Sequence, residues 1–403
     1  MQIANRKYHI HVIEDLNQFS KLKEVWNTLV REQKYHIPFL CHEWFSLWLK
    51  HFLGHNKLLM LLVSDGIRPL AIVPFVIKAE KFKGLFPCSK LDLIGNAHSP
   101  VRKFIFGHLT DNTKIDIAED IFLFLCNQFR HWDVIELDSL PEEDYSFHIL
   151  SQAISKCRMK NRQYFCFGNW YLDNINYSGD EYIGRRSKNT KKQLKKRMSR
   201  LSELGNLVFK IGNEKEKVNH YMELYQQVRA KSWKHAEIDS GFHEDFRRLM
   251  AEKGWLRFGF LALNGSPIAV QIRIVCNRTA YFMNTAHDSK YDKFSPGTLL
   301  RTEFSKYLID ADNVLEIDTL KGDEPYKKEW TPKRRERKGI TIFNNNLKGQ
   351  FLAFMMITIL QNIEKHPYLS SLKGNLSQFL KKNSKFYFLL RKHILNHGAR
   401  CIN

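Results

Sequence analysis

The chain has 403 residues, of which 43% are hydrophobic and 13% aromatic, so it is neither a disordered nor a fibrous protein. This length predicts two domains that each bury a core. The 63 lysine and arginine residues outnumber the 42 acidic residues, giving a formal net charge of +21. Polyanions such as coenzyme phosphates, RNA or an anionic membrane surface are therefore expected partners, and excess lysine that serves solubility alone is the equally weighted alternative.

The seven cysteines are scattered, and none forms a Cys-x-x-Cys pair. This pattern predicts neither a disulfide framework nor a zinc site, and no metal ligands are expected. The N-terminus lacks the apolar core of a signal peptide. The longest apolar run, 351–360, is about half of the ~20 residues that span a membrane. We therefore expect a cytoplasmic protein with reduced thiols.

The first half of the chain opens with a predicted strand at Tyr8–Ile13 and amphipathic helices at Phe19–Gln33 and Phe39–Phe52. Aromatic residues recur at helical spacing in the second of these helices, a pattern typical of core packing. An apolar strand at Leu58–Val63 then meets an Asp-Gly turn, and a return strand begins at Pro69. These elements predict an α/β domain.

Two landmarks of the first half recur in the second half in the same order. Pro69–Ile72 reappears as Pro267–Val270, and Val134–Leu140 reappears as Val314–Leu320. Two matched landmarks favour an internal duplication over chance similarity. The first copy has no glycine-containing loop like the one at 295–298, so we expect a degenerate half that forms walls rather than binding a cofactor.

The composition changes abruptly at Arg185–Arg200, which holds nine basic side chains and no acid. Ser187 is a suitable N-cap for a helix in this segment. One interpretation is a solvated helix face, since like charges at close spacing cost only tenths of a kcal/mol. The other is a site for phosphates or RNA, for which the candidate polyanion ligands are Lys188, Lys191, Lys192 and Lys195.

Residues 255–330 carry the most informative pattern. An apolar strand at Trp255–Leu263 meets Asn264-Gly265, a strong hairpin signal. The return strand alternates, with isoleucine and valine on one face and Gln271 and Arg273 on the other. This pattern predicts a hairpin with one buried and one polar face.

A third strand, Thr279–Thr285, leads to Ser295-Pro296-Gly297-Thr298. There the serine is a predicted N-cap and the proline the first residue of a helix that continues through Leu299–Ile309. A strand at Val314–Leu320 and an acidic turn at Lys321–Lys327 follow. A glycine at a helix start lets backbone N–H groups approach a phosphate, and the helix dipole adds to the attraction.

In this strand order, the motifs Phe294–Leu300 and Asp318–Lys327 resemble those of GNAT-type N-acyltransferases. They particularly resemble the tandem-domain branch related to Fem peptidoglycan ligases and polysaccharide-biosynthesis acetyltransferases. The resemblance implies an α/β (α+β) fold of two tandem GNAT-like domains, each a mixed central sheet flanked by helices. The expected domains are a degenerate one at 1–170, an acyl-CoA-binding one at 180–346 and a basic helical tail at 347–403.

The resemblance also implies where a coenzyme would lie. Acetyl-CoA or another acyl-CoA would occupy a splay between Thr279–Thr285 and Val314–Leu320, held by backbone hydrogen bonds. Its pyrophosphate would sit over the start of the following helix. The expected cofactor-binding residues are Thr285, Ser295, Gly297, Thr298 and Leu299.

Three side chains are candidates for catalysis. Asp318 shares a strand face with Glu316, where burial would raise its pKa toward that of a base, and hydrogen bonding to a loop is its structural alternative. Tyr326 follows the last core strand, where the family places a tyrosine near the coenzyme sulfur. Lys327 is expected to steady the phosphates or an anionic acceptor, unless it is only an exposed turn lysine.

The tail from Lys348 onward holds nine basic residues and a single acid, Glu364. Its pattern predicts an apolar helix at Gln350–Ile363 and a basic, aromatic helix at Leu376–Leu395. Docking on the core is one interpretation. Peripheral attachment to the anionic inner face of a membrane is the other.

The resemblance, together with these patterns, implies three functional classes. The first is an acyl-CoA-dependent N-acyltransferase that acetylates a small-molecule amine, namely a sugar, a nucleotide sugar or an amino acid, in cell-envelope polysaccharide biosynthesis. The second is a Fem-like ligase that takes its donor from aminoacyl-tRNA. The segment 208–255 leaves no room for the long coiled-coil arm common in Fem ligases, which favours acyl-CoA over tRNA. The third is a non-catalytic scaffold of the same fold at a membrane surface. DNA is not an expected partner.

Overall fold

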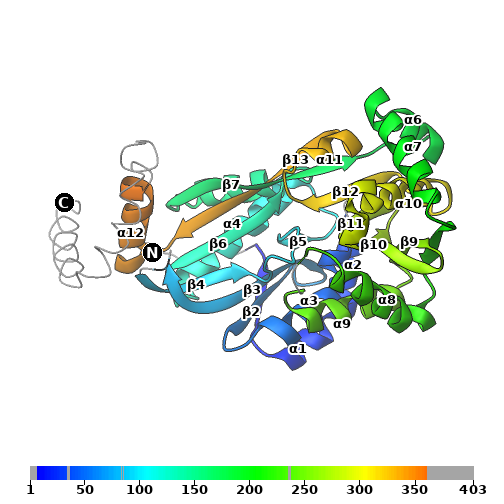
Figure 1. Cartoon of the computed structure of the whole chain (residues 1–403). Coiled ribbons are helices and arrows are strands. Elements are labelled where there is room, and N and C mark those ends of the chain that lie inside the picture. Colours follow the sequence, from blue (N-terminus) through cyan, green and yellow to red (C-terminus); the bar gives the residue numbers. More distant parts are fainter. Residues whose placement is uncertain (1–6, 34–36, 83, 85, 235–236, 361–403) are drawn as a thin grey trace, which may run out of the picture. The chain divides into compact units, whose positions relative to one another are not determined.

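The chain forms two compact units, each of mixed α/β structure (Figure 1). The first unit comprises residues 1–34, 53–166 and 337–403, and the second comprises residues 35–52 and 167–336. This computed structural model describes residues 7–33, 37–82, 84, 86–234 and 237–360.

The first unit contains a mixed sheet in the order β1-β2-β3-β4-β6-β13-β7, with β5 paired to β3. Its strands are β1 (His9–Ile13), β2 (Lys57–Ser64), β3 (Pro69–Phe82), β4 (Phe86–Leu93), β5 (Ile105–Phe106), β6 (Val134–Pro141), the first part of β7 (Asn161–Leu172) and the last part of β13 (Lys333–Phe343). Its helices are α1 (Leu16–Lys21), α2 (Lys23–Arg31), α4 (Asp111–Asn127), α5 (Ser146–Lys156), α12 (Leu347–Ala353) and the π-helix η4 (Phe354–Leu360).

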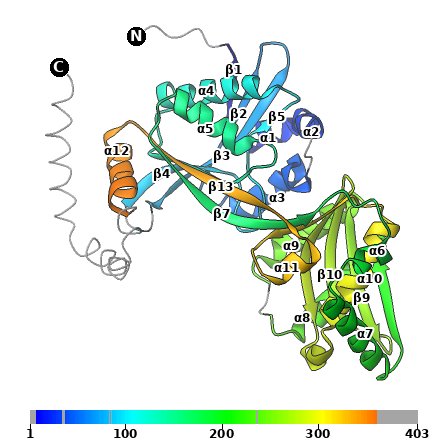
Figure 2. The ribbon, with the colours of Figure 1, turned by 90° about the horizontal axis from the view of Figure 1, so that it is seen from above.

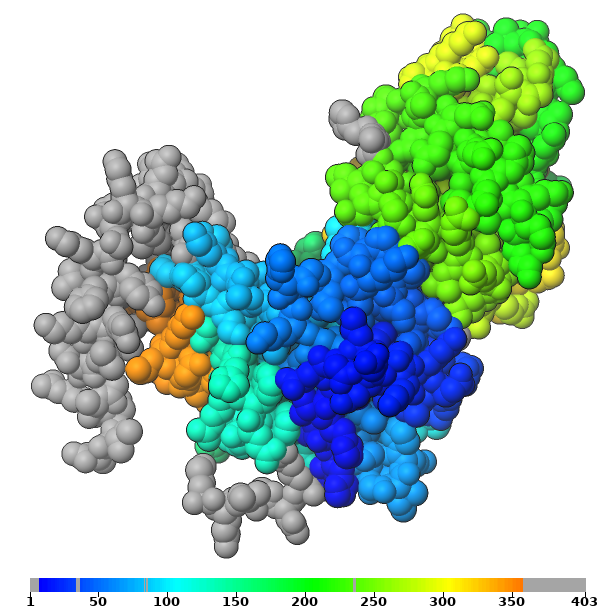
Figure 3. All heavy atoms as spheres, turned by 90° about the horizontal axis from the view of Figure 1, so that it is seen from below, coloured from blue at the N-terminus to red at the C-terminus, as the bar shows by residue number. Residues whose placement is uncertain are grey.

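The core of the first unit lies between its sheet and the helices α4 and α5, which pack side by side. On α4, Ile117, Ile121 and Leu125 are fully buried, as the apolar spacing of this segment predicts. The predicted helix Phe19–Gln33 is instead two helices that meet at Leu22. This α1–α2 segment, dark blue in Figure 3, lies at the surface of the unit.

The second unit contains a mixed sheet in the order β7-β12-β11-β10-β9-β8. Its strands are the last part of β7, β8 (Leu207–Gly212), β9 (Leu256–Leu263), β10 (Ser266–Cys276), β11 (Thr279–His287), β12 (Glu316–Lys321) and the first part of β13. Its helices are α3 (His42–Phe52), α6 (Gly179–Gly184), α7 (Lys188–Ser202), α8 (Val218–Ala230), α9 (Ser240–Glu252), α10 (Pro296–Asp310), α11 (Tyr326–Trp330) and the short 3-10 turns η1 (Pro38–Leu40), η2 (Lys215–Lys217) and η3 (Ser289–Phe294).

Helices cover both faces of this second sheet. Helices α6, α7 and α10 lie on one side, and α8 and α9 lie on the other (Figure 2). The apolar residues Leu300, Phe304 and Leu308 of α10 are fully buried in the core that includes Leu261 and Ile317 of the sheet. Burial of this apolar face holds α10 on the sheet, with its N-terminus after β11 and η3.

The two units repeat one order of elements, which confirms the predicted duplication. A hairpin (β2–β3 or β9–β10) leads to a third antiparallel strand (β4 or β11), a helix (α4 or α10) and a strand parallel to the third (β6 or β12). Both hairpins carry a bulge directly after the landmark proline, between Pro69 and Ala71 and between Pro267 and Ala269. The two prolines therefore occupy equivalent strands.

The unit boundaries differ from the predicted 1–170 and 180–346. Residues 337–343 of β13 pair with β6 in the first unit, while residues 169–172 of β7 pair with β12 in the second. Each unit thus completes its sheet with a strand segment that follows the other unit in sequence. Such long-range pairing leaves no mark on local periodicity, which is why the sequence pattern missed it.

The segment 35–52 belongs to the second unit because α3 packs on α9. The rings of Trp44 and Phe242 lie 6.4 Å apart, and those of Phe39 and Phe246 lie 6.0 Å apart. The aromatic stripe of this helix is buried, as the sequence predicted. The helix is buried against the second unit, however, although it lies within the first half of the sequence.

The predicted separate tail, 347–403, is described only to residue 360. Phe351 and Leu352 of α12 pack in an apolar cluster with Val134 and Phe343 of the first unit, which agrees with core docking of the predicted apolar helix. The predicted helix Leu376–Leu395 lies outside the described residues, so its membrane attachment stays a prediction. None of the described helices combines the length and the hydropathy of a membrane span.

Candidate active site

In the second unit, β11 and β12 pair as parallel strands and then separate. Only three residue pairs join them: Thr279 with Glu316, Ala280 with Ile317 and Tyr281 with Asp318. Beyond these pairs β11 continues to His287 and β12 to Lys321. Backbone N–H and C=O groups along the open edge can therefore hydrogen-bond an extended ligand. This is the splay that the sequence resemblance predicted.

A bulge in β11 lies at the splay. Against β10, the register moves from Phe282 opposite Arg273 to Thr285 opposite Gln271. Bulges redirect a strand and its side chains and are frequent next to active sites. The bulged residues and Thr285 are half-buried, so this part of β11 is accessible to a ligand.

The N-terminus of α10 lies directly beyond β11 and η3. Ser295 occupies the N-cap position, as predicted, but its backbone is left-handed (φ 50°) and its hydroxyl makes no capping hydrogen bond. Its carbonyl instead accepts hydrogen bonds from Thr298 N at 2.9 Å and Leu299 N at 3.2 Å. Two of the amides predicted to bind pyrophosphate are therefore already engaged. The Gly297 amide has no acceptor among the described residues, and it stands at the positive end of a 15-residue helix.

Side chains from other elements gather at Gly297. A β-carbon built on this glycine would lie 3.5 Å from His287 Nδ1 and 3.9 Å from Thr285 Oγ1. His287 Nε2 is 2.7 Å from Asp292 Oδ1. A proton on Nε2 that faces this carboxylate leaves Nδ1 as the acceptor nitrogen. The sequence analysis missed this His–Asp pair, although the two residues are close in sequence.

A lysine reaches the same strand from the loop between α8 and α9. Lys234 Nζ donates to the carbonyl oxygen of Thr285 at 2.8 Å. Burial lowers the pKa of Lys234, and the nearby Arg229 lowers it further. The donors around Gly297 thus comprise a free amide, the Thr285 hydroxyl and the neighbouring Lys234 ammonium, which together favour an anionic ligand.

The polar face of β10 lies beneath α10 instead of facing solvent. Gln271 is 0% exposed and Arg273 is 2% exposed. Gln271 Nε2 donates to the carbonyl oxygen of Gly297 at 2.7 Å. Alternation along β10 was predicted correctly, but packing of α10 on this face makes it a buried polar face.

Asp318 is 3% exposed, and its oxygens are surrounded by donors. Oδ1 accepts hydrogen bonds from Asn169 Nδ2 at 2.7 Å and from Leu320 N at 2.6 Å, and Oδ2 pairs with Arg335. Glu316 shares the same guanidinium at 2.9 Å; burial raises the pKa of Glu316, and Arg335 opposes the rise. This geometry supports the structural alternative for Asp318 rather than its predicted role as a base.

Lys327 is 6% exposed and holds the acidic turn together. Its Nζ lies 2.8 Å from the carbonyl oxygen of Lys321 and 2.9 Å from Glu324 Oε2. The predicted contact of this ammonium with phosphates or an acceptor is therefore not supported. The turn instead presents Tyr326, which is 51% exposed and lies with its ring centre 4.9 Å from the Arg301 guanidinium.

The basic helix forms as predicted. Ser187 caps α7 by accepting a hydrogen bond from Thr190 N at 3.1 Å. Leu194 and Leu201 are buried and form the narrow apolar seam. The four predicted polyanion ligands are all exposed, namely Lys188, Lys191, Lys192 and Lys195.

The first unit has an equivalent opening between β4 and β6, but a side chain fills it. The parallel pairing again ends after three pairs, at Asp92 and Glu136. Beyond that point Arg102 N donates to Ser139 O at 3.2 Å, and its guanidinium lies 3.5 Å from Asp92 Oδ1. An arginine in this position supports the interpretation of the first unit as a degenerate copy.

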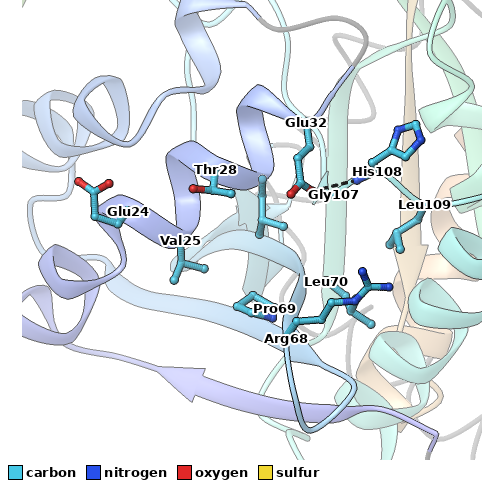
Figure 4. Close-up of a pocket in the computed structure, with 11 residues that line it drawn as sticks. Glu24, Val25, Thr28, Glu32, Arg68, Pro69, Leu70, Gly107, His108 and Leu109 are labelled. Atoms are coloured by element: carbon cyan, nitrogen blue, oxygen red, sulfur yellow. Dashed lines mark hydrogen bonds between the residues drawn. The ribbon is translucent and has the colours of Figure 1, made fainter.

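The first unit also contains a pocket of about 360 Å³ (Figure 4). It lies between α2, the start of β3 and the segment 107–109, with Val25 and Leu70 among its apolar residues. Glu24 and Glu32 add carboxylates, and Glu32 Oε2 accepts a hydrogen bond from His108 N at 3.1 Å. None of the predicted site residues lines this pocket.

Residues 188–328 match a family model described as an acetyltransferase (GNAT) domain. The second unit is built on a GNAT domain. The matched residues include β11, α10, β12 and the turn that presents Tyr326, so the family predicted from sequence is confirmed. A GNAT domain within the chain indicates an enzyme of the acyltransferase class.

Three solved structures illustrate the similarity of this chain to known proteins. The crystal structure of FemX matches with a TM-score of 0.55 at 11% identity, covering 85% of this chain and 100% of FemX. The C-terminal domain of a putative lysylphosphatidylglycerol synthetase from Agrobacterium fabrum matches with a TM-score of 0.48 at 11% identity, covering 83% of this chain and 95% of its own. A tandem GNAT protein from the clavulanic acid biosynthesis pathway matches with a TM-score of 0.41 at 11% identity, covering 83% and 98%. The FemX match shows a shared fold; a search of curated proteins found no similar sequence.

Proposed function

We propose that the second unit binds an acyl-CoA and transfers its acyl group, acetyl in the simplest case, to a small-molecule amine. The observation that carries this proposal is the separation of β11 from β12 after Tyr281 and Asp318, directly before the N-terminus of α10. An open strand edge suits the amide-rich arm of a coenzyme, and a helix N-terminus suits its pyrophosphate.

The reaction balances without a covalent enzyme intermediate. The amine nitrogen attacks the thioester carbonyl, a C–N bond forms, and the C–S bond breaks. The proton that the nitrogen loses balances the proton that the departing thiolate gains, and we assign delivery of the latter to Tyr326. Lys327 contributes indirectly, because it holds the turn that presents this tyrosine.

The acceptor class follows from the surroundings of the splay. Lys234 and Arg301 are cations close to β11 and Tyr326, and they favour an acceptor that also bears negative charge. A nucleotide sugar or an amino acid used in cell-envelope polysaccharide assembly meets this requirement. Titration calorimetry of the full chain with acetyl-CoA and longer acyl-CoAs tests the donor. Saturable binding is expected, and absence of binding to every acyl-CoA would exclude the proposal.

Replacing Tyr326 with phenylalanine is expected to lower kcat by about 100-fold with little change in the affinity for acyl-CoA, because only a proton donor used in the transition state is lost. Steady-state kinetics and calorimetry separate the two effects. Tyr145 is also exposed, and it follows β6 of the first unit as Tyr326 follows β12 of the second, so it gives the matched control: Tyr145→Phe should leave kcat unchanged. An unchanged kcat in Tyr326→Phe would remove this residue from the mechanism.

One observation favours a second candidate function, a Fem-like ligase that takes its donor from aminoacyl-tRNA. The helix α7 presents exposed lysines and arginines with no acid within 188–202. A surface of this kind binds phosphate backbones through counterion release. No interleaved aromatic residues accompany it, so base-specific contacts are not expected.

Changing Lys191, Lys192, Lys195 and Lys196 to glutamine is expected to weaken tRNA binding and to reduce the slope of log K against log salt by up to about 3, since each lost phosphate contact removes roughly 0.7–0.9. Binding assays over a series of salt concentrations measure both changes. The control variant carries glutamine at four other exposed lysines of the second unit: Lys210, Lys215, Lys217 and Lys231. An equal effect in both variants would show that net charge alone matters and that α7 is not a docking surface.

A further inference from the structure

Two arginines lie opposite each other on neighbouring strands of the second unit, and they differ in their partners. Arg257 of β9 is in register with Arg273 of β10. Arg257 forms an ion pair with Asp312 at 3.0 Å. Arg273 is 2% exposed, and among the described residues no carboxylate lies within ion-pair distance of it. A buried charge without a counter-charge lowers the stability of the folded state, so a buried arginine without an acidic partner calls for a physical reason.

The Arg273 guanidinium is fixed by neutral groups. Nη1 donates to Ile272 O at 2.8 Å, and Nη2 donates to Gln271 Oε1 at 2.5 Å. The guanidinium carbon lies 3.7 Å from the centre of the Phe282 ring. Its Nε has no hydrogen-bond acceptor among the described residues. Burial lowers the pKa of Arg273, and Arg301 lowers it further, so the surroundings oppose a charge that arginine nevertheless retains.

Gln271 passes the orientation of Arg273 on to the start of α10. A guanidinium only donates, so the amide oxygen of Gln271 must face Arg273 and its NH₂ must face the other way. That NH₂ donates to the Gly297 carbonyl at 2.7 Å. The carbonyl is thereby drawn toward the sheet, and the first turn of α10 is fixed with the free Gly297 amide beside His287 and Thr285.

We propose that Arg273 and Gln271 are positioning residues for anion binding at α10, and that the bound anion is the counter-charge that Arg273 lacks in the protein alone. They fix the Gly297 peptide and place a buried positive charge behind it, without touching the ligand. A buried charge is screened little by salt, so it acts over a longer distance than a surface lysine. This inference rests on the proposed function for the identity of the anion, a coenzyme pyrophosphate.

Gln271→Glu separates this role from a merely structural one. A carboxylate at this position gives Arg273 its missing counter-charge, so thermal stability should be equal to or above that of the parent. The same carboxylate has no hydrogen to donate to Gly297 O, and it cancels the positive charge behind the helix. We therefore expect at least 10-fold weaker binding of acyl-CoA together with an undiminished unfolding temperature. If Gln271 served packing alone, the affinity of the variant for acyl-CoA would change only as much as its thermal stability does.

Two further variants calibrate the result. Arg273→Lys keeps the charge but loses the two-pronged geometry, so it should bind with intermediate affinity. Arg257→Met removes the paired arginine of the neighbouring strand and should lower the unfolding temperature while the folded protein keeps its affinity.

The test is calorimetry of the full-length parent and variants with two probes, acetyl-CoA and inorganic pyrophosphate. Binding of both probes by the parent and weak binding of both by Gln271→Glu is the expected result. Parent-like binding by Gln271→Glu would overturn the positioning role. A parent that binds pyrophosphate and no acyl-CoA would refute the proposed function while leaving the positioning role open to the same variant. If the parent binds neither probe, both proposals are wrong.

Discussion

A Gly297→Val protein is expected to bind acyl-CoA at least 10-fold more weakly than the parent and to unfold at nearly the same temperature. The backbone of Gly297 is not in the left-handed region, and a β-carbon there would meet His287 and Thr285 only at ordinary contact distances. The folded protein can therefore accept valine, whose helix propensity is higher than that of glycine. The branched γ-carbons would occupy the space in front of the free amide, where a phosphate must approach.

Gly297→Ala is the graded control for this experiment, because it adds the β-carbon without the branches. Its loss of affinity should be smaller than that of Gly297→Val, and calorimetry with acetyl-CoA measures both. Parent-like affinity in the valine variant would show that the N-terminus of α10 is not the pyrophosphate site. A large loss of thermal stability in the same variant would mean that the first turn of α10 is more tightly packed than the structure indicates.

Replacing Arg247 with methionine is expected to lower the free energy of unfolding by about 3–5 kcal/mol, the usual effect of removing one partner of a buried ion pair. Arg247 and Glu237 bond at 2.6 Å, with 3% and 6% of their side chains exposed. Tyr225 and Asn284 also bond the carboxylate, which ties the loop carrying Lys234 to β11. Chemical denaturation measures the loss, and the exposed neighbour Arg248→Met should change stability by no more than about 0.5 kcal/mol.

The same pair predicts a pH dependence whose sign reverses in the variant. In the parent, burial alone would raise the pKa of Glu237, but the hydrogen bonds and charge of Arg247 outweigh burial and hold the pKa below its usual range. Its stabilisation is therefore fully present above the unfolded pKa of about 4.3 and is lost as pH falls through the lower folded pKa. Arg247→Met removes the largest interaction that opposes burial and leaves only neutral donors and the weaker charges of His243 and Arg229. The folded pKa therefore rises, and the stability deficit should shrink as pH falls. A deficit that is constant with pH would show that lost packing, rather than the stranded carboxylate, causes the destabilisation.

The elements that sequence alone identified depend on short-range chemistry. Asn264-Gly265 forms the predicted hairpin because both residues adopt the positive φ that such turns require. Ser187 caps α7 because its hydroxyl reaches an amide three residues on. The repeat of Pro69–Ile72 as Pro267–Val270 identified the duplication, since equivalent strands keep equivalent residues. Local pattern also placed the helix that follows β11, whereas the splay was an expectation from the family resemblance.

The role of each polar side chain was decided by tertiary structure. Asp318 was a reasonable candidate base until Arg335 of β13, 17 residues further along the chain, was found on its carboxylate. Lys327 was expected at a ligand, but its ammonium binds the carbonyls of its own turn. Hydrogen-bond partners of buried groups come from elements far apart in sequence, so neither composition nor spacing reveals them.

By itself, the sequence determined the two-copy organisation, the order of strands and helices, and the position of the turn before α10, because periodicity, turn residues and caps act over a few positions. The family followed from the resemblance of two motifs to those of known proteins. Only the tertiary structure shows that α3 packs in the second unit and that residues 337–343 of β13 complete the sheet of the first unit. Both facts depend on contacts between segments that are distant in sequence. The tertiary structure also shows that Gln271 and Arg273, two polar residues of an alternating strand, lie buried beneath α10. The sequence determines whether a strand face is polar or apolar, but the elements that pack against the face determine whether it is exposed to solvent.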